Sequence, residues 1–183
     1  MKWAGRSDTK LTAVDGYLSI VSKREVRDYS DRPIDPDARR RILEAGRVSG
    51  SSANKQQWRF VAVESDQKRE QLAELVYVPG NIRGAKLIVV LTVHGSGPTS
   101  FDAGRAAQQM MLAAWNEGIG SCPNGMPDRE AVGGMLGLHA GEEPAIILTF
   151  GYPARAIDPE RRTPHEWIER ANRKPFDEVV ETV

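Results

Sequence analysis

A short basic run holds the side chains best suited to bind a ligand. Lys23, Arg24 and Arg27 lie within five positions of one another. Cations placed so closely repel one another unless an anion lies among them, and a phosphate monoester offers about two negative charges and several strong acceptor oxygens. The run therefore indicates a phosphate site. A solvated charged turn, in which Glu25 and Asp28 neutralise the cations locally, is the alternative interpretation.

A second polar cluster comes directly before Trp58. Apart from one lysine it consists of uncharged donors and acceptors: Ser51, Ser52, Asn54, Lys55, Gln56 and Gln57. A run of this kind can hold a ribityl chain or the edge of a heterocycle. Because Ser and Asn also cap helices and form turns, a structural role is the alternative.

Several other chemistries lack the residues that they need. The histidines are far apart in the sequence, and none has the spacing of a metal-binding motif: His94, His139 and His165. The GxSxG elbow of a hydrolase is missing. Ser100 replaces the last glycine of a dinucleotide fingerprint, and Pro98 removes an amide from the same loop. We therefore expect no metal site, and a Rossmann-type cofactor site is disfavoured.

Length and composition set further bounds. The chain has 183 residues, with 25 Lys and Arg against 25 Asp and Glu, which predicts a single domain over residues 1–183 and argues against nucleic acid or an anionic membrane as a partner. Cys122 is the only cysteine, so no internal disulfide can form and a reducing compartment is the default. No stretch approaches the roughly 20 apolar residues of a membrane span. We expect a cytoplasmic protein in which Cys122 is a small buried residue.

The segments that must position these residues alternate between helices and strands. Helices are expected over residues 11–22, from the cap Asp35 onward, from Ser65 or Asp66 to Pro79-Gly80, over residues 100–117 and from Asp128 to about Gly137. Strands are expected over residues 58–63, 86–93 and 144–152, with a glycine- and proline-rich loop over residues 118–127. This order predicts an α/β or α+β domain with a helix layer against the sheet.

Two segments suggest a partner subunit. The expected helix over residues 100–117 is apolar on more than one face, so it is buried either in the domain or at an interface. The tail over residues 153–183 has few core-type residues, so it lies either on its own domain or on a second copy of the chain. Both features favour a homodimer.

At the level of whole motifs, the sequence resembles the nitroreductase family of flavin mononucleotide (FMN) enzymes. Family members carry an RRSxRxF-like segment, which residues 23–29 resemble, and an APSxxNxQPW-like segment, which residues 50–60 resemble. The likeness covers the chain from about residue 15 and continues through residues 43–47, 102–115, 118–121, 136–138, 150–153 and 172–180.

Four positions depart from the family pattern. Lys23 stands for an arginine, which keeps the charge but loses the bidentate fork. Glu25 stands for a serine that helps to bind phosphate in the family, and its negative charge opposes an anion unless the side chain points elsewhere. Gly50 and Gln57 each stand for a proline.

The resemblance implies an α+β sandwich with a mixed central sheet flanked by helices, in a homodimer with two FMN sites at its interface. It also implies an NAD(P)H-dependent oxidoreductase. The flavin takes a hydride at N5 from NADH or NADPH and passes it to a flat acceptor such as a nitroaromatic or a quinone. Because the flavin carries the chemistry, no catalytic side chain is expected. A related enzyme of dehalogenase or dehydrogenase type, and a flavin-binding redox module without turnover, are alternatives.

The resemblance also implies which residues contact FMN. Lys23, Arg24 and a tail cation hold the phosphate, with Arg173 preferred to Arg162, and Arg27 lies at the pyrimidine edge. Residues 51–56 reach the flavin of the opposite subunit, and residues 123–125 offer a backbone N–H to N5. The full expected set is Lys23, Arg24, Glu25, Arg27, Gly50, Ser51, Ser52, Asn54, Gln56, Pro123, Asn124, Gly125, Arg173 and Lys174.

Overall fold

The computed structural model describes residues 16–183, which divide into two compact units. The larger unit spans residues 23–158, and the smaller one joins the described residues before position 23 to residues 159–183. The first part of the helix expected over residues 11–22 lies outside the described residues.

The larger unit is built on a four-stranded sheet with the order β1-β2-β4-β3. The strands are β1 (Trp58–Ala62), β2 (Leu87–His94), β3 (Gly120–Asn124) and β4 (Glu142–Gly151). All neighbouring strands pair antiparallel. The sheet therefore differs from the mixed sheet that was expected, and within the described residues parallel pairing is limited to one isolated bridge, between Glu25 and Ser121.

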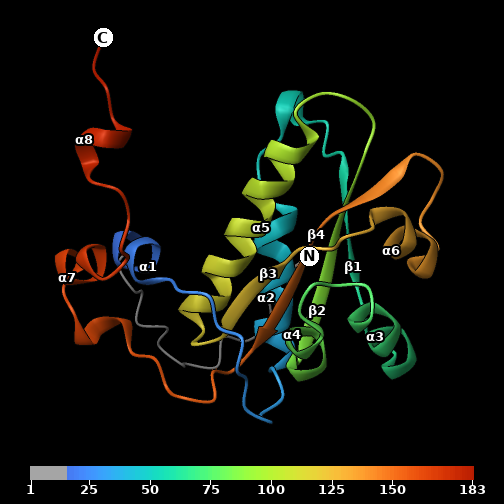
Figure 1. Ribbon diagram of the computed structural model, residues 1–183, viewed down its shortest axis with the longest axis horizontal. Helices are drawn as coiled ribbons and strands as arrows, with labels where there is room; N and C mark the ends of the chain where they lie inside the picture. The colour runs from blue at the N-terminus through green and yellow to red at the C-terminus, as the bar shows by residue number, and fades with distance from the viewer. Residues whose placement is uncertain (1–15) are drawn as a thin grey trace, which may run out of the picture. The chain divides into compact units, whose positions relative to one another are not determined.

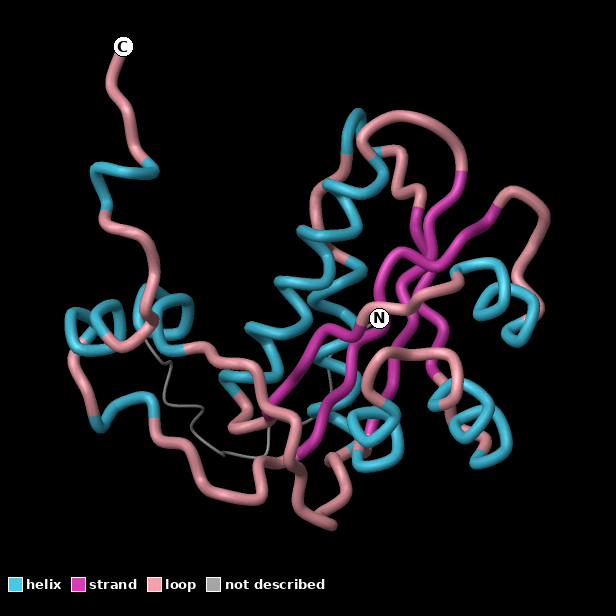
Figure 2. The backbone as a smooth tube through the Cα atoms, in the orientation of Figure 1, coloured by secondary structure: helices cyan, strands magenta, loops and turns pink. Residues whose placement is uncertain are grey.

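Side chains alternate across β2, so this central strand contributes residues to a hydrophobic core on each face of the sheet. Leu87, Val89 and Leu91 are buried against α2 (Pro36–Arg47) and α5 (Thr99–Asn116). Ile88 and Val90 are buried on the opposite face, against α3 (Asp66–Ala73), α4 (Pro79–Gly84) and α6 (Arg129–Leu136). The larger unit is thus a helix–sheet–helix sandwich, as Figures 1 and 2 show, and the predicted α+β class is confirmed.

Side-chain caps set several of the helix starts. Asp35 accepts hydrogen bonds from the backbone N–H groups of Asp37 (2.9 Å) and Ala38 (3.4 Å), directly before Pro36 at the first helical position. Ser65 caps α3, and Asp128 caps α6. These are the starts that the sequence predicts, because a cap residue next to a helical pattern is a local signal.

Two local predictions were wrong. Residues 118–127 are not only a loop, because Gly120–Asn124 form the edge strand β3 against β4. Glycine, proline and asparagine are poor strand formers, so here tertiary pairing overrides propensity. Pro79 does not end the preceding helix, which already stops at Ala73; it begins α4, since proline suits the first helical position.

The smaller unit contains α1 (Gly16–Ser22), a 3₁₀ turn η2 (Pro159–Arg161), α7 (Pro164–Glu169) and α8 (Phe176–Val179). Thr163 and Glu166 form a reciprocal capping box at the start of α7. Trp167 is buried, and its indole N–H donates to the carbonyl of Pro159 (2.8 Å). Phe176 and Val179 of α8 are largely exposed.

Candidate functional site

The basic run over residues 23–29 contacts the edge strand β3 at Ser121 and, at its far end, the residues that follow β4. The N–H of Val26 donates to the carbonyl of Ser121 (3.0 Å), and that of Ser30 donates to the carbonyl of Tyr152 (2.8 Å). The contact is close because Gly120 has no side chain: a Cβ there would lie 2.5 Å from the Cβ of Val26. The run is therefore docked through its backbone, while the side chains of Arg27 and Asp28 remain exposed.

The charges of this segment are partly paired within it. The Lys23 ammonium lies 2.6 Å from a carboxylate oxygen of Glu25, and the Lys23 side chain is only 6% exposed. Arg24 donates to the carbonyl of Lys23 (2.9 Å). Arg27 is exposed. Burial raises the pKa of the Cys122 thiol, and the positive charge of Arg27 beside it opposes that rise. Cys122 is buried, as expected.

Residues 50–57 form an exposed loop with unusual backbone geometry. Ser52–Asn54 make a 3₁₀ turn, and left-handed φ values occur at Ala53 (50°), Asn54 (53°) and Gln56 (52°). Non-glycine residues in this region cost about 1–3 kcal/mol each and gather at functional segments. The loop is stabilised internally by the Gln56 N–H, which donates to the Ser51 hydroxyl (2.9 Å).

Two residues of α5 that the sequence reasoning did not single out hold this loop. The buried carboxylate of Asp102 accepts a hydrogen bond from the Ser52 N–H (2.9 Å). Arg105 lies 3.9 Å from Asp102, and a Cβ at Gly50 would be only 2.5 Å from its guanidinium. Arg105 thus fills the room that a proline at position 50 would need. One signal in the sequence could have pointed to Asp102, because it is an acidic residue in the first turn of an expected helix.

Gln57 ties this loop to the segment after β2. With its amide turned so that both groups find partners, Gln57 donates to the Ser96 carbonyl (3.0 Å) and accepts from the Ser96 N–H (3.3 Å). Gly95 has a φ of +76°, and a Cβ there would lie 1.9 Å from the end of the Gln57 side-chain amide. The positive φ and the nearby Gln57 side chain both favour glycine at position 95.

The end of β3 presents backbone on one side and a buried side chain on the other. Pro123 and Gly125 are exposed, whereas Asn124 is buried. The Asn124 amide donates to the Cys122 carbonyl (3.0 Å) and the Thr149 hydroxyl (3.1 Å), and its oxygen accepts from Asn81 (2.7 Å). Any ligand at residues 123–125 would therefore meet their backbone and the Pro123 ring, and not the Asn124 side chain.

The same network extends to Tyr29, at the far end of the basic run. Its hydroxyl lies 3.1 Å from the Thr149 hydroxyl, and burial raises its pKa. Tyr29 is thus protonated at any ordinary pH and serves as a neutral hydrogen-bonding group. Together, Tyr29, Asn81 and Thr149 support residues 123–125 from behind. Sequence reasoning found Tyr29 only as an anchor of the basic run, and it missed Asn81 and Thr149, since nothing local relates them.

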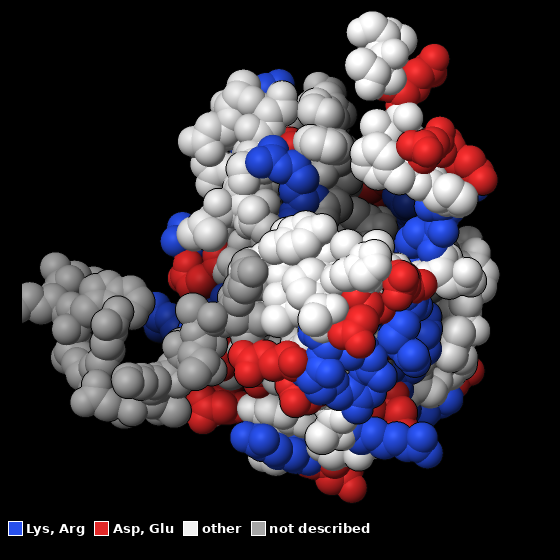
Figure 3. All heavy atoms as spheres, turned by 90° about the vertical axis from the view of Figure 1, so that its left-hand side faces the viewer, with Lys and Arg blue, Asp and Glu red and all other residues white. Residues whose placement is uncertain are grey.

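The two tail candidates for the phosphate lie in the smaller unit. Arg173 is exposed and donates to the carbonyl of Ala171 (2.6 Å). The Arg162 guanidinium lies over the Trp167 ring, 5.0 Å from its centre. Desolvation, followed by the charges of Arg161 and Arg170, lowers the pKa of Arg162. Lys174 is exposed. Figure 3 looks onto the side on which α1 and α7 are drawn in Figure 1, where basic side chains gather beside acidic ones.

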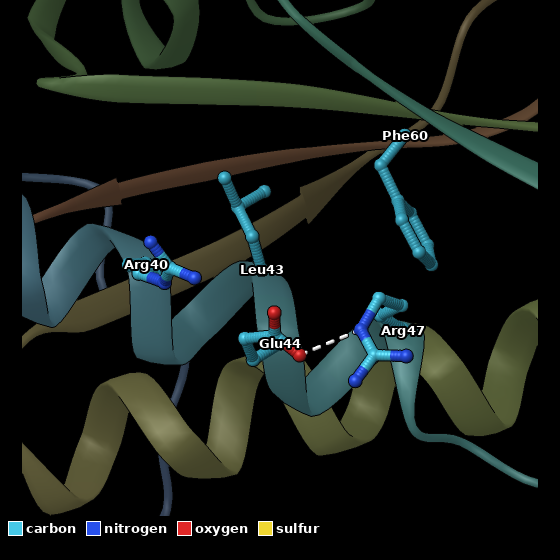
Figure 4. A pocket seen from close by; sticks show the side chains of 5 residues that line it. All are labelled: Arg40, Leu43, Glu44, Arg47 and Phe60. Carbon is cyan, nitrogen blue, oxygen red and sulfur yellow. Dashed lines mark hydrogen bonds and ion pairs between the residues drawn. The ribbon is translucent and has the colours of Figure 1, made fainter. Parts of the chain in front are cut away.

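A shallow hollow between α2 and β1 is lined by none of the residues expected to contact FMN. The Arg47–Glu44 ion pair (2.6 Å) lies at one side of it, and Phe60 at the other (Figure 4). Over residues 16–183, no group of three or more His, Cys, Asp or Glu side chains could hold a metal ion. Within the same range, no helix has the length and apolar character needed to span a membrane.

Comparison with known proteins identifies the family. The model of the Nitroreductase family matches residues 20–91 and 80–152. The chain belongs to the nitroreductase family. The matched residues include the basic run, the loop over residues 50–57 and the end of β3, so the resemblance inferred from the motifs is confirmed.

Individual relatives are similar over most of their length. The NADH dehydrogenase of Thermus thermophilus is 24% identical over 200 residues, which cover 88% of this chain and 98% of the relative. The NADPH-flavin oxidoreductase of Vibrio harveyi is 24% identical over 173 residues, which cover 84% of this chain and 72% of the relative.

Solved structures share the fold. A nitroreductase-type protein of Desulfovibrio desulfuricans, solved in complex with FMN, has a TM-score of 0.79 at 25% identity, over 94% of this chain and 98% of that chain. The NADPH:FMN oxidoreductase of Vibrio harveyi, solved with NAD+, has a TM-score of 0.78 at 21% identity, over 92% of this chain and 77% of that chain.

Proposed function

We propose that this nitroreductase-family chain is an NAD(P)H-dependent FMN oxidoreductase acting on a flat acceptor such as a nitroaromatic or a quinone. The observation that carries the proposal is the docking of residues 23–29 along β3. It brings the basic run to the strand that ends in residues 123–125. The segment expected at the phosphate thus contacts the strand that leads to the segment expected at N5, which supports a site for a single FMN.

The residues present fit an FMN molecule. Arg27 is an exposed cation on the docked segment, and it would lie near the pyrimidine edge, with Arg24 toward the phosphate. Pro123 and Gly125 are exposed at the end of β3, where glycine permits close approach of a ring to the backbone. When bound, FMN supplies hydride acceptance and donation at N5. The chain orients the substrates and places charge, and no side chain is assigned as acid or base.

A homodimer completes the proposed site. Residues 51–56 are largely exposed and include left-handed φ values at Ala53, Asn54 and Gln56, and we place them against the FMN of the opposite subunit. The apolar residues of α5 are buried within the larger unit. This helix was expected to be buried either in the domain or at an interface, and burial in the domain accounts for it without a partner subunit. Support for the dimer comes from the family and from large exposed apolar side chains such as Phe101 and Phe176. The single-domain organisation and the cytoplasmic location remain predictions.

The absorbance of the purified protein tests this function. The protein should carry a yellow flavin that NADH or NADPH bleaches under anaerobic conditions and that a nitroaromatic or a quinone restores. A bound flavin that neither nicotinamide reduces would instead identify a flavin-binding module without turnover. A protein that does not bind FMN at all would refute the proposal.

The tail cation can be assigned by substitution. Arg173→Ala should weaken FMN binding about tenfold or more, because a charge-assisted contact to phosphate contributes about 1.5–3 kcal/mol. Arg162→Ala removes the same charge from the smaller unit and should leave FMN affinity unchanged. Fluorescence titration of the apoprotein measures both. A loss with Arg162→Ala and none with Arg173→Ala would reverse the assignment.

Arg27 should raise the midpoint potential of the bound flavin. A cation near N1 and its neighbouring carbonyl stabilises the charge that reduction leaves there, so Arg27→Gln should lower the two-electron midpoint potential by tens of millivolts, at about 30 mV per 1.4 kcal/mol. Redox titration against a reference dye measures the potential. A surface ion pair with Asp28 or Asp31 is the competing role for Arg27, and a potential within a few millivolts of wild type would support it.

A further inference from the structure

The Lys23–Glu25 ion pair occupies the place where the family pattern has a phosphate-binding arginine and serine. The two residues are two positions apart on extended backbone, so their side chains project to the same side. The ammonium lies 2.6 Å from the carboxylate. The Lys23 side chain is 6% exposed, and that of Glu25 is 37% exposed.

Lys23 depends on this carboxylate. The Lys23 ammonium also lies 3.6 Å from the sulfur of Met111, but a thioether is a weak acceptor that carries no charge. A buried ammonium is costly unless an anion compensates it. Glu25 therefore supplies from within the chain the negative charge that a flavin phosphate would otherwise supply.

We propose that Glu25 is an internal competitor for the flavin phosphate, and that it lowers the selectivity of this protein for FMN over riboflavin. The inference rests on the proposed function, because it assumes that the phosphate lies at Lys23 and Arg24. A phosphate approaching Lys23 meets either the Glu25 carboxylate or an ammonium already neutralised by it. The phosphate thus adds less to affinity than the charges of Lys23 and Arg24 suggest.

The experiment compares two flavins that differ only in the phosphate. Dissociation constants of FMN and riboflavin are measured by fluorescence quenching for the wild-type apoprotein and for Glu25→Gln. We expect Glu25→Gln to bind FMN about tenfold more tightly and riboflavin within about twofold of wild type. An unchanged ratio of the two constants would overturn the inference while leaving the proposed function intact. Absence of binding by both flavins would overturn the proposed function and the inference with it.

A matched control separates a local effect from a change of net charge. Glu70→Gln removes the same charge on α3, where Glu70 pairs with Arg83, and should leave both dissociation constants unchanged. Tighter FMN binding in Glu70→Gln by the same factor would mean that overall charge is responsible, which contradicts the inference.

A second background tests whether Glu25 acts through Lys23. In Lys23→Gln, the additional change Glu25→Gln should tighten FMN binding much less than it does in the wild-type background. An equal gain in both backgrounds would overturn the role of the ion pair.

Thermal unfolding with and without inorganic phosphate provides a readout that does not need flavin. Phosphate should raise the melting temperature of Glu25→Gln more than that of wild type, and an equal rise would count against the inference.

Discussion

Gly120→Ala is expected to lower the free energy of unfolding by about 3 kcal/mol and to weaken FMN binding at least tenfold. A Cβ at this position would lie 2.5 Å from the Cβ of Val26 and within 2.8 Å of both its methyl carbons. Since the Cβ of Val26 is fixed to the backbone, relief requires residues 23–29 to move away from β3. Overpacking of this kind costs about 1–3 kcal/mol, and the proposed phosphate segment moves with it. Denaturant unfolding and FMN titration measure the two effects.

Gly134→Ala provides the matched control. Gly134 lies within α6, and a Cβ there would meet nothing within 4 Å. Alanine is the better helix former by about 1 kcal/mol, so this variant should be slightly more stable than wild type and should bind FMN normally. If Gly120→Ala behaves like Gly134→Ala, residues 23–29 are not docked on β3 as described.

Asn124→Ala is expected to lower the free energy of unfolding by about 3 kcal/mol and to slow reduction of the flavin by NAD(P)H. The substitution leaves the buried Asn81 amide without the partner that it has in the structure, whereas the Cys122 carbonyl keeps the Thr149 hydroxyl as a donor. Each buried polar group left unpaired costs about 1–3 kcal/mol. Because the network also supports the backbone of residues 123–125, its loss should disturb the group that we place at N5. Chemical denaturation and stopped-flow absorbance measure the two effects.

Thr149→Ser separates the network from general packing. It keeps the hydroxyl that contacts both Tyr29 and Asn124 and removes only a methyl group, so we expect a loss of about 1 kcal/mol and normal flavin reduction. If Asn124→Ala retains wild-type stability and reduction rate, the buried network does not position residues 123–125.

Local signals in the sequence were sufficient for much of the fold. Asp35-Pro36, Ser65 and Asp128 mark helix starts by short-range capping, which requires no knowledge of the rest of the chain. The apolar run of β2 is buried throughout, as a central strand covered on both faces must be. The ordered motifs led to the nitroreductase family, which the family comparison confirms.

The candidate site could be predicted only in part. Its segments were found because polar and basic residues gather at positions 23–27 and 50–57, and these patterns are visible in one dimension. The direction in which each side chain points was not visible in the sequence. Asn124 faces the interior, and Lys23 is paired with Glu25. Asp102 accepts a hydrogen bond from a loop about fifty positions away in the chain, and Arg105 lies beside that loop.

The sequence by itself determined the elements that depend on neighbours along the chain: capped helices, the buried central strand and the family motifs. Tertiary structure alone decided what depends on contacts between distant residues. Gly120–Asn124 became a strand because β4 offers a free edge, although their propensities oppose it. The basic run became a docked segment because Gly120 leaves room for Val26. Such contacts are set by packing and hydrogen bonding across the fold, and short-range patterns in the sequence do not specify them.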